Sequence, residues 1–281
     1  MIELKAYAKI NLTLDILARL DDGYHRIESI KQQVGLHDAV NIEPFEDLKI
    51  LCTNENIPPK QNLVFKTALL LKNEFNVADG AKITIKKNIP LAAGLAGGSS
   101  NAAAALVGLN KLWNLELDEA ELTKLASEIG MDVPFSVIGG SCFAEERGTK
   151  LTKIDLPEMH VLLVNPGFEV STRKAYHSLD MSQIGKKLAT RRLLDIKVHG
   201  IRAISKTLYN DFETVLLSKH SALKEIKENL LKNSALNAAV SDSGPTVFGL
   251  FEDEKTISDA YENLKGSYPF VFKTKTIRRE E

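Results

Sequence analysis

Residues 90–100 read "PLAAGLAGGSS" and are the stretch whose residue types and spacing are best suited to chemistry. Three glycines and two serines run directly into the alanine-rich segment "NAAAAL". Glycines let several backbone N–H groups turn toward one anion, and the first turn of a helix adds unpaired N–H groups and the positive end of its dipole. This combination is typical of phosphate binding, with the serine hydroxyls as further ligands for the phosphate or its metal ion.

This loop differs from two well-known phosphate motifs. A P-loop has a lysine before its Ser/Thr, where this chain has Gly98, and "GLAGG" does not match the dinucleotide pattern GxGxxG. The structural alternative is a glycine turn that only introduces a buried helix. The spacing predicts a phosphate site and leaves that alternative open.

Composition limits the classes of function. The chain has 281 residues, 44% hydrophobic and 26% charged, with a formal net charge of -1. These values are typical of a globular protein with one large or two modest domains. The balanced charge argues against a sequence-independent nucleic-acid partner, and no apolar run reaches the about 20 residues of a membrane span. Cys52 and Cys142 show neither a disulfide framework nor a zinc pattern. We expect a cytoplasmic protein without a nucleic-acid or membrane partner.

The elements before and after the loop alternate in period. "INLTLDIL" and "AVNIEPFEDLKILC" predict strands, the second as a hairpin that turns at Glu46-Asp47. "NLVFKTALLLKNEF" predicts a helix, "AKITIKKNIP" a strand, and the segment behind the loop a second helix. In "LDEAELTKLASEIG", Asp118 and Glu121 form a capping box and Gly130 ends a third helix. "MDVPFSVIGGSCFAEERG" predicts a short helix followed by a strand.

A new run of elements begins near residues 150–158. "DLPEMHVLLVNP" predicts a strand, and "STRKAYHSL", residues 186–207 and "HSALKEIKENLLKN" predict helices. "LNAAVSDSGPTVFGLF" predicts two strands around a glycine turn, residues 254–264 a helix, and "FVFKTKTI" a last strand. This order predicts an α+β protein with a mixed α/β first half and a ferredoxin-like sandwich in the second half.

Three motifs, in this order, resemble those of the GHMP kinases (galactose, homoserine, mevalonate and phosphomevalonate kinases). They are "AKINLTL" near the N-terminus, the glycine loop with its flanks, and "SDSGPTVFGLF". Together they span nearly the whole chain. The resemblance implies the GHMP kinase fold, an N-terminal domain over residues 1–155, a C-terminal domain over residues 156–281, and an active site in the cleft between them. It also implies ATP and Mg²⁺ as cofactors.

The resemblance places ATP at the glycine loop and beside "NLVFKTA". The implied nucleotide-binding residues are Asn62, Pro90, Ala92, Ala93, Gly94, Leu95, Ala96, Gly97, Gly98, Ser99 and Ser100. Asn62 also suits the N-cap of the helix that follows it, and both roles are compatible. Lys86 or Lys87 could reach the nucleotide from the preceding strand, and the sequence does not distinguish between them.

Lys9 in "AKINLTL" and Asp132 in "GMDVPF" are the catalytic pair that the resemblance implies. Phosphoryl transfer needs a cation near the developing charge and a carboxylate oriented to accept the hydroxyl proton. Lys9 suits the first role and Asp132 the second, and contact between them would keep Asp132 ionised. The structural alternatives are an exposed strand lysine and a plain helix N-cap before Pro134.

Four stretches resemble one branch of this family: "AKINLTLDIL" with "DDGYH", "NLVFKTA", "GMDVPF" and "NDFE". That branch phosphorylates a hydroxyl of a cytidine-diphosphate-linked methylerythritol in the non-mevalonate route to isoprenoid precursors. The implied substrate contacts are Asn11, Tyr24, His25, Thr172 and Tyr176, with the base between the two tyrosines. A tyrosine can stack on a pyrimidine, and a histidine can hydrogen-bond its edge. The alternatives are loop packing for Tyr24 and a surface position for His25.

The chain departs from the family pattern at two positions. Tyr7 stands before "AKIN" where the family usually has proline, and Asp242 stands in "SDSGP" where it usually has glycine. Aspartate tolerates positive φ less well than glycine, and its carboxylate would lie near substrate or phosphate oxygens. We expect Asp242 to point away from the phosphates or to lie beside a lysine or Mg²⁺ that offsets its charge.

Rival functions are distinguished by particular residues. A homoserine or mevalonate kinase has no base for Tyr24 and Tyr176 to stack on, and a non-catalytic nucleotide-binding protein does not need both Lys9 and Asp132. The neutral charge and the aromatic fraction of 6% disfavour an RNA-binding module. A dinucleotide oxidoreductase would need GxGxxG. The sequence predicts a small-molecule substrate, identifies no metal ligands, and leaves monomer and homodimer open.

Overall fold

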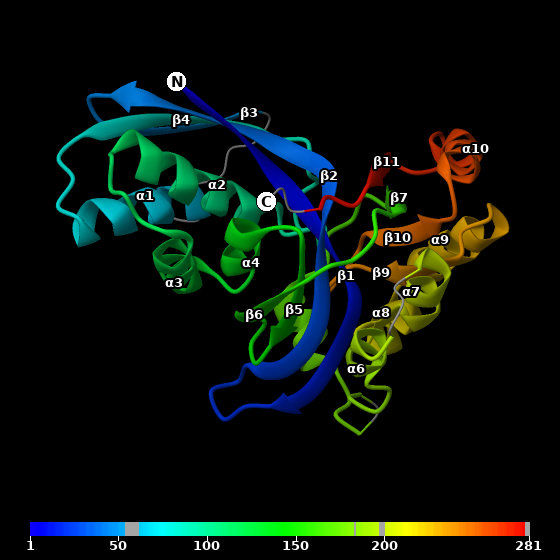
Figure 1. The fold of residues 1–281 in the computed structure, drawn as a ribbon. Coiled ribbons are helices and arrows are strands. Elements are labelled where there is room, and N and C mark those ends of the chain that lie inside the picture. Colours follow the sequence, from blue (N-terminus) through cyan, green and yellow to red (C-terminus); the bar gives the residue numbers. More distant parts are fainter. Residues whose placement is uncertain (54–61, 183, 197–199, 279–281) are drawn as a thin grey trace. The chain divides into compact units, whose positions relative to one another are not determined.

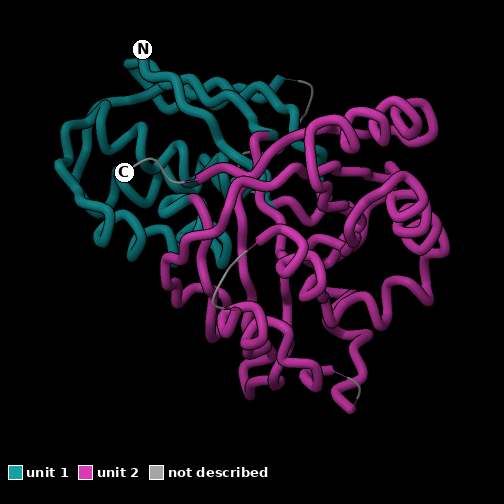
Figure 2. Tube along the Cα trace, turned by 45° about the vertical axis from the view of Figure 1, so that its right-hand side comes forward, with its two compact units in different colours: residues 1–8, 36–91, 96–139 teal, residues 9–35, 92–95, 140–281 magenta. Residues whose placement is uncertain are grey.

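The computed structural model describes residues 1–53, 62–182, 184–196 and 200–278 (Figure 1). The chain divides into two compact units, each assembled from separate stretches of sequence (Figure 2). Unit 1 comprises Met1–Ala8, Leu36–Leu91 and Ala96–Gly139, and unit 2 comprises Lys9–Gly35, Ala92–Leu95 and Gly140–Glu281. Strands β1 (Ile2–Arg19) and β2 (His25–Phe45) contribute residues to both units. The predicted domain boundary at residue 155 stays a prediction.

Unit 1 combines sheet strands with helices that bury a shared apolar core. It contains β3 (Leu48–Thr53), β4 (Gly80–Lys86), α1 (Leu63–Glu74), α2 (Gly97–Leu112), α3 (Glu119–Ile129) and α4 (Val133–Ile138). Alanines let α2 approach the sheet closely, because residues 102–105 are buried and a Cβ on Gly108 would lie 2.4 Å from Ile42 Cδ1. The helix predicted behind the glycine loop is confirmed, and so are those predicted before and after it.

The hairpin predicted at Glu46-Asp47 is wrong. Strand β4 lies between β2 and β3, antiparallel to β2 and parallel to β3. It begins against the turn itself, since Ala81 N donates to the Asp47 carbonyl at 3.1 Å. Burial explains the order: Ala81, Ile83 and Ile85 of β4 are buried, whereas β3 alternates between half-buried and exposed residues, as an edge strand does.

Capping residues set the ends of the helices in unit 1. The Asp118 carboxylate accepts from Glu121 N, and Glu121 Oε2 accepts from Asp118 N, both at 2.9 Å. Gly130 follows the last turn of α3, so the predicted capping box and helix end are confirmed. Asn62 Oδ1 accepts from Val64 N at 2.9 Å and caps α1, which confirms the predicted N-cap.

Unit 2 contains a four-stranded antiparallel sheet in the order β11-β7-β10-β9. Its strands are β7 (His160–Asn165), β9 (Asn237–Val240), β10 (Val247–Phe251) and β11 (Phe270–Lys275). Numbered within this sheet, the order is fourth, first, third, second, which is the ferredoxin-like arrangement predicted from the sequence. Helices α9 (Ser221–Lys232) and α10 (Glu254–Leu264) bury one apolar face each, formed by Leu223, Ile226, Leu230, Ile257, Ala260 and Leu264.

The other elements of unit 2 lie outside this sandwich. Strands β5 (Ser141–Glu145) and β6 (Lys150–Ile154) pair with each other, β5 also pairs with β2, and β8 (Tyr209–Asn210) pairs in parallel with β1. The helices are α5 (Thr172–His177), α6 (Ala189–Leu194), α7 (Ile201–Thr207) and α8 (Glu213–Lys219). Strands β6 and β8 and helix α8 were not predicted. The helical prediction over residues 186–207 is confirmed by α6 and α7, and its residues 197–199 lie outside the described residues.

Among the residues described, none of the helices combines the length and the apolar character that crossing a bilayer requires.

Candidate active site

The glycine loop enters α2 through alternating left-handed residues. Ala92, Gly94 and Ala96 have φ values of 46°, 73° and 55°. Such alternation turns backbone N–H groups to one side and forms a concave site for an anion. Ala96 is also the N-cap of α2 and brings no side-chain hydrogen bond to the first turn. Ser100 is buried, and its hydroxyl donates to the Gly97 carbonyl at 3.0 Å. The backbone of this loop suits a phosphate group.

A buried carboxylate organises the approach to the loop within unit 1. Asp38 is fully buried and accepts from the N–H groups of residues 88–89 at 2.7 and 2.8 Å and from Asn101 Nδ2 at 2.8 Å. It also pairs with the Lys87 ammonium, which lies near the first turn of α2 and donates to Asn101 Oδ1 at 3.2 Å. Of the two lysines that the sequence left open, the structure places Lys87 beside α2 and leaves Lys86 exposed.

Lys9 lies in the interior of unit 2, although it is charged. Its side chain is 1% exposed, and its ammonium donates to Asn11 Oδ1 at 2.6 Å and to Asp242 Oδ2 at 2.5 Å. Asn11 in turn donates to Ser29 Oγ at 2.8 Å, so its orientation is fixed. The alternative of an exposed strand lysine is wrong. The expectation that Asp242 lies beside a lysine is confirmed.

Asp132 occupies the N-cap position of α4, but its side chain makes no capping hydrogen bond. Its backbone carbonyl accepts from both the N–H and the hydroxyl of Ser136 at 3.1 Å, in the first turn of the helix. Asp132 thus occupies the N-cap position of the structural alternative, ahead of Pro134, without the side-chain bond of an ordinary cap. Its contact with Lys9 stays a prediction.

Aromatic residues predicted to hold the base lie in unit 2. The His25 ring stacks on Tyr176 with centroids 4.6 Å apart, and Tyr176 meets Phe212 edge-on at 4.7 Å. Tyr24 is 48% exposed, and the Arg147 guanidinium lies 4.8 Å from its ring centroid. The structure brings His25 and Tyr176 together and pairs Tyr24 with Arg147. A base held between Tyr24 and Tyr176 stays a prediction.

The environment of His25 favours a neutral imidazole. Its pKa lies below the ordinary value of 6.5, chiefly because burial disfavours the charged form, and the positive charges of Arg19 and His177 act in the same direction. Near neutral pH one ring nitrogen therefore donates and the other accepts. This is the hydrogen-bonding capacity that the edge of a cytosine requires.

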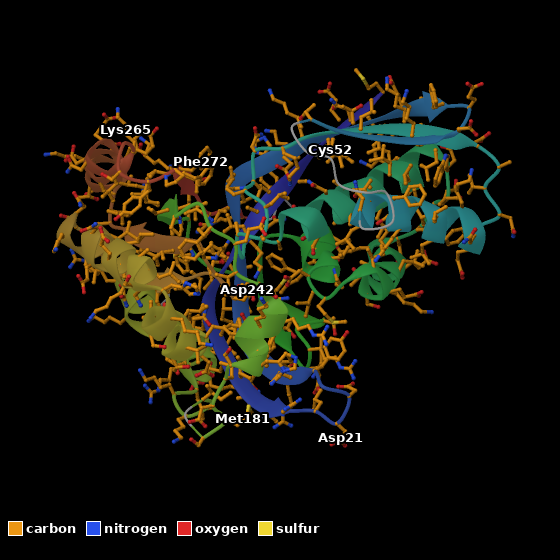
Figure 3. All side chains as sticks on the ribbon, turned by 180° about the vertical axis from the view of Figure 1, so that it is seen from behind. Asp21, Cys52, Met181, Asp242, Lys265 and Phe272 are labelled. Atoms are coloured by element: carbon orange, nitrogen blue, oxygen red, sulfur yellow. The ribbon has the colours of Figure 1, made fainter. Side chains whose placement is uncertain are left out.

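The turn between β9 and β10 gathers several predicted residues. Thr172 Oγ1 and Ser243 Oγ lie 2.7 Å apart, and Ser243 follows Asp242 in this turn. Through the Asp242 carboxylate, the same turn accepts a hydrogen bond from Lys9, which also donates one to Asn11. Asp242 is labelled in Figure 3. Three side chains predicted for the site, on β1 and α5, are thus connected through one turn.

A pocket of about 470 Å³ opens in unit 2 between the segments around α5 and α8. Ala92 of the glycine loop borders it. The polar residues of its lining are Glu169, Ser171, Lys174, Ser178, Lys219 and His220. Its charged side chains include Lys174 and Lys219 as well as Glu169, and Lys219 Nζ donates to Ser178 Oγ at 2.6 Å.

Comparison with known proteins agrees with this geometry. Residues 62–140 match the family model described as GHMP kinases N terminal domain, and residues 193–269 match GHMP kinases C terminal. The 4-diphosphocytidyl-2-C-methyl-D-erythritol kinase of Caldanaerobacter subterraneus subsp. tengcongensis is 41% identical over 278 residues, which cover 98% of this chain and 97% of the relative. The same kinase of Clostridium perfringens (strain ATCC 13124) is 43% identical over 282 residues, 98% of each chain.

The chain belongs to the 4-diphosphocytidyl-2-C-methyl-D-erythritol kinase family. A crystal structure of 4-(cytidine 5'-diphospho)-2C-methyl-D-erythritol kinase matches with a TM-score of 0.84 at 28% identity, covering 98% of this chain and 99% of that one. Methanococcus jannaschii mevalonate kinase matches with a TM-score of 0.77 at 16% identity over 99% and 98% of the two chains, a likeness of fold alone. The predicted GHMP kinase fold and the prediction of an ATP-dependent small-molecule kinase are confirmed.

One of the two departures from the pattern of this kinase family has a local explanation. Tyr7, in place of the usual proline, packs edge-on against His37 with ring centroids 5.3 Å apart. The substitution therefore adds an aromatic contact within unit 1 and leaves the course of β1 intact. Asp242 is the more consequential departure, because its carboxylate contacts Lys9.

The donor set bears on how a kinase of this family would hold Mg²⁺. Across residues 1–53, 62–182, 184–196 and 200–278, no group of three or more His, Cys, Asp or Glu side chains could hold a metal ion. Mg²⁺ commonly binds through substrate phosphates, water and one or two carboxylates. The described residues therefore supply no preformed cage of these side chains for Mg²⁺.

Sequence reasoning missed two residues that support the site of this kinase. Asp38 gave no signal because its partners follow about fifty positions later, and Arg147 lies in the unpredicted turn between β5 and β6.

Proposed function

We propose that this kinase transfers the γ-phosphate of ATP to a hydroxyl of 4-diphosphocytidyl-2-C-methyl-D-erythritol, in the non-mevalonate route to isoprenoid precursors. The observation that carries the proposal is 41% and 43% identity, over nearly the whole chain, to kinases named for that substrate. We further propose a cytoplasmic enzyme, a monomer or homodimer. The family matches at 62–140 and 193–269 fall on either side of residue 155, which supports a domain boundary there.

The proposed nucleotide site begins with the glycine loop. The ATP phosphates lie along residues 92–100, where alternating positive φ values turn N–H groups toward them. Asn62 caps α1 and lies by the adenine, and Lys87 contributes positive charge from its place beside α2. Mg²⁺, when bound, neutralises charge on the phosphate oxygens.

The proposed chemical step uses Lys9 and Asp132. The acceptor oxygen forms a bond to the γ-phosphorus while the bond from that phosphorus to the ADP oxygen breaks. Asp132 orients the hydroxyl and takes its proton, and the Lys9 ammonium faces the charge that develops on the phosphoryl oxygens. Two hydrogen bonds, to Asn11 and Asp242, support this role of Lys9 because they fix the ammonium in position.

The proposed acceptor site uses the aromatic residues of unit 2. The cytosine stacks between Tyr24 and Tyr176, and the neutral His25 hydrogen-bonds its edge. Stacking contributes about 1–3 kcal/mol per base, enough to select a cytidine-linked alcohol over a small alcohol. Asn11 and Thr172 hydrogen-bond the rest of the acceptor.

The test is ADP release with Mg-ATP and three acceptors: 4-diphosphocytidyl-2-C-methyl-D-erythritol, homoserine and mevalonate. We expect turnover of the cytidine compound alone, with kcat falling about 100-fold or more in Asp132→Asn, as for loss of a positioned base. Asp118→Asn is the matched control, because asparagine caps α3 nearly as well as aspartate. Turnover of homoserine or mevalonate instead would identify another GHMP activity. No turnover with any acceptor would favour a non-catalytic nucleotide-binding protein.

A further inference from the structure

Asp242 meets Lys9 in a geometry that the family's usual glycine cannot provide. The two charged atoms lie 2.5 Å apart, with side-chain exposures of 1% for Lys9 and 22% for Asp242. A charge-assisted hydrogen bond at such a site is stronger than a neutral one, because little water competes for the ammonium. Asn11, the other partner in this pair of contacts, is neutral.

The carboxylate of Asp242 is itself held in place. Asp242 has a φ of 53°, which aspartate tolerates better than most residues other than glycine. Its Oδ1 accepts from Ser243 N at 2.9 Å, and its backbone carbonyl accepts from Asn210 Nδ2 at 2.7 Å. One carboxylate oxygen is thus bound to the turn, and the other is presented to Lys9.

The turn that carries Asp242 is also joined to the glycine loop. Ser241 Oγ donates to the Gly94 carbonyl at 2.8 Å, and Thr246 N donates to the Ala93 carbonyl at 3.3 Å. Lys9 N donates to the Leu95 carbonyl at 3.1 Å. Lys9, residues 93–95 of the glycine loop and the turn that carries Asp242 are therefore joined by hydrogen bonds within unit 2.

We propose that Asp242 is a positioning residue that holds the ammonium of Lys9 in place before ATP and the acceptor bind, a role that rests on the proposed function. The flexible four-carbon stem of lysine loses its freedom on folding, so the ammonium need not be ordered during the reaction. Asp242 acts through Lys9 and touches neither substrate. Because Lys9 offsets its charge, Asp242 leaves the binding of the anionic substrates nearly unchanged.

The kinetic test is Asp242→Asn, which keeps the shape and the tolerance of positive φ but removes the charge. We expect kcat to fall about 10- to 100-fold, as for misplacement of a reacting group, while KM for each substrate stays within about threefold. An unchanged kcat would overturn the proposal. A large fall in KM for the cytidine substrate would also overturn it, because Asp242 would then obstruct binding.

Glu213→Gln is the matched control for a general loss of stability. Glu213 Oε2 lies 2.5 Å from Lys227 Nζ, and Oε1 accepts from Val240 N at 2.7 Å, so it is a similarly placed carboxylate in the same unit. We expect this variant to keep its kcat. Equal losses of kcat in Glu213→Gln and Asp242→Asn would overturn the positioning role.

A double-mutant cycle in the absence of nucleotide and acceptor tests the contact independently of the proposed function. The free energies of unfolding of wild type, Lys9→Met, Asp242→Asn and the double variant are measured in urea. We expect coupling of about tenfold in the unfolding equilibrium constant, as for residues in direct contact. Additive effects would overturn the proposal, whatever reaction the enzyme catalyses.

Discussion

Gly94→Ala tests the close approach between the glycine loop and the β9–β10 turn. At Gly94 φ is +73°, and a Cβ there would lie 2.3 Å from the Ser241 carbonyl oxygen and 3.0 Å from that of Gly244. Both obstacles are backbone atoms, so the loop must move away by about 1 Å to reach ordinary contact distance. That movement would weaken the bonds from Ser241 Oγ to the Gly94 carbonyl and from Thr246 N to the Ala93 carbonyl.

The expected loss of stability has two parts. Left-handed backbone costs alanine about 1–2 kcal/mol. Loss of the two hydrogen bonds adds about 1–3 kcal/mol, at about 0.5–1.5 kcal/mol each. Gly23→Ala separates these parts, because Gly23 has a φ of +85° and nothing within 4 Å of the added Cβ. We therefore expect Gly94→Ala to lower the free energy of unfolding by about 1–3 kcal/mol more than Gly23→Ala.

The assay is urea unfolding followed by circular dichroism, with kcat and KM for ATP measured on the same preparations. Gly98→Ala is a third variant, whose Cβ would meet only Leu63 Cδ1 at 3.9 Å among neighbouring atoms within 4 Å. We expect it to keep its stability and to raise KM for ATP, because a side chain would enter the proposed phosphate site. Equal losses of stability in Gly94→Ala and Gly23→Ala would refute the close approach of loop and turn.

Three other predictions concern side chains that support the site. Asp38→Asn should lower the free energy of unfolding in urea by about 3–5 kcal/mol, because the buried Lys87 ammonium loses its counter-charge; a loss below about 1 kcal/mol would contradict this. Arg147→Met should raise KM for the cytidine substrate about two- to fivefold at constant kcat, since an exposed cation–π contact with Tyr24 is worth about 0.5–1 kcal/mol; an unchanged KM would show that Arg147 does not support the base. Burial lowers the pKa of His25 in the folded state, so the folded state is favoured at pH values above the unfolded-state pKa of about 6.5. This contribution to stability should be lost as the pH falls through the folded-state pKa. The urea midpoint should therefore fall more steeply from pH 8 to pH 5 in wild type than in His25→Gln. Parallel curves for the two proteins would contradict the lowered pKa of His25.

Local signals in the sequence predicted most elements but not all of their neighbours. The capping box of Asp118 and the helix over residues 254–264 were predicted correctly, because each depends on residues within a few positions. The pairing of β3 was not, because period-two spacing shows which face of a strand is buried and not which strand lies beside it. The ferredoxin-like order was recoverable because strand and helix succession strongly limits the topologies.

In the candidate site, too, the sequence indicated local features but not the contacts between residues far apart in the chain. The left-handed backbone of the glycine loop agrees with the spacing of its glycines, and a lysine partner was among the expectations for Asp242. Lys9 came from the family resemblance, and its burial excludes the alternative of an exposed strand lysine. No local pattern could identify that partner as Lys9, because 233 positions separate the two residues. The stacking of His25 on Tyr176 was likewise beyond sequence reasoning, which assigned the two rings separate roles.

The short strand β8 has a consequence for how the protein is made in a cell. It covers the edge of β1, with Thr13 opposite Tyr209, and Asp211 Oδ2 then accepts from Ile16 N across 195 positions of sequence. At about 5–20 residues per second, a ribosome completes that partner about 10–40 s after β1 has been synthesised. Until then the β-forming segment "INLTLDIL" has an open edge on the nascent chain. Lower growth temperatures, and chaperones that shield this segment, should therefore raise the yield of folded enzyme more than substitutions on the surface of the folded protein.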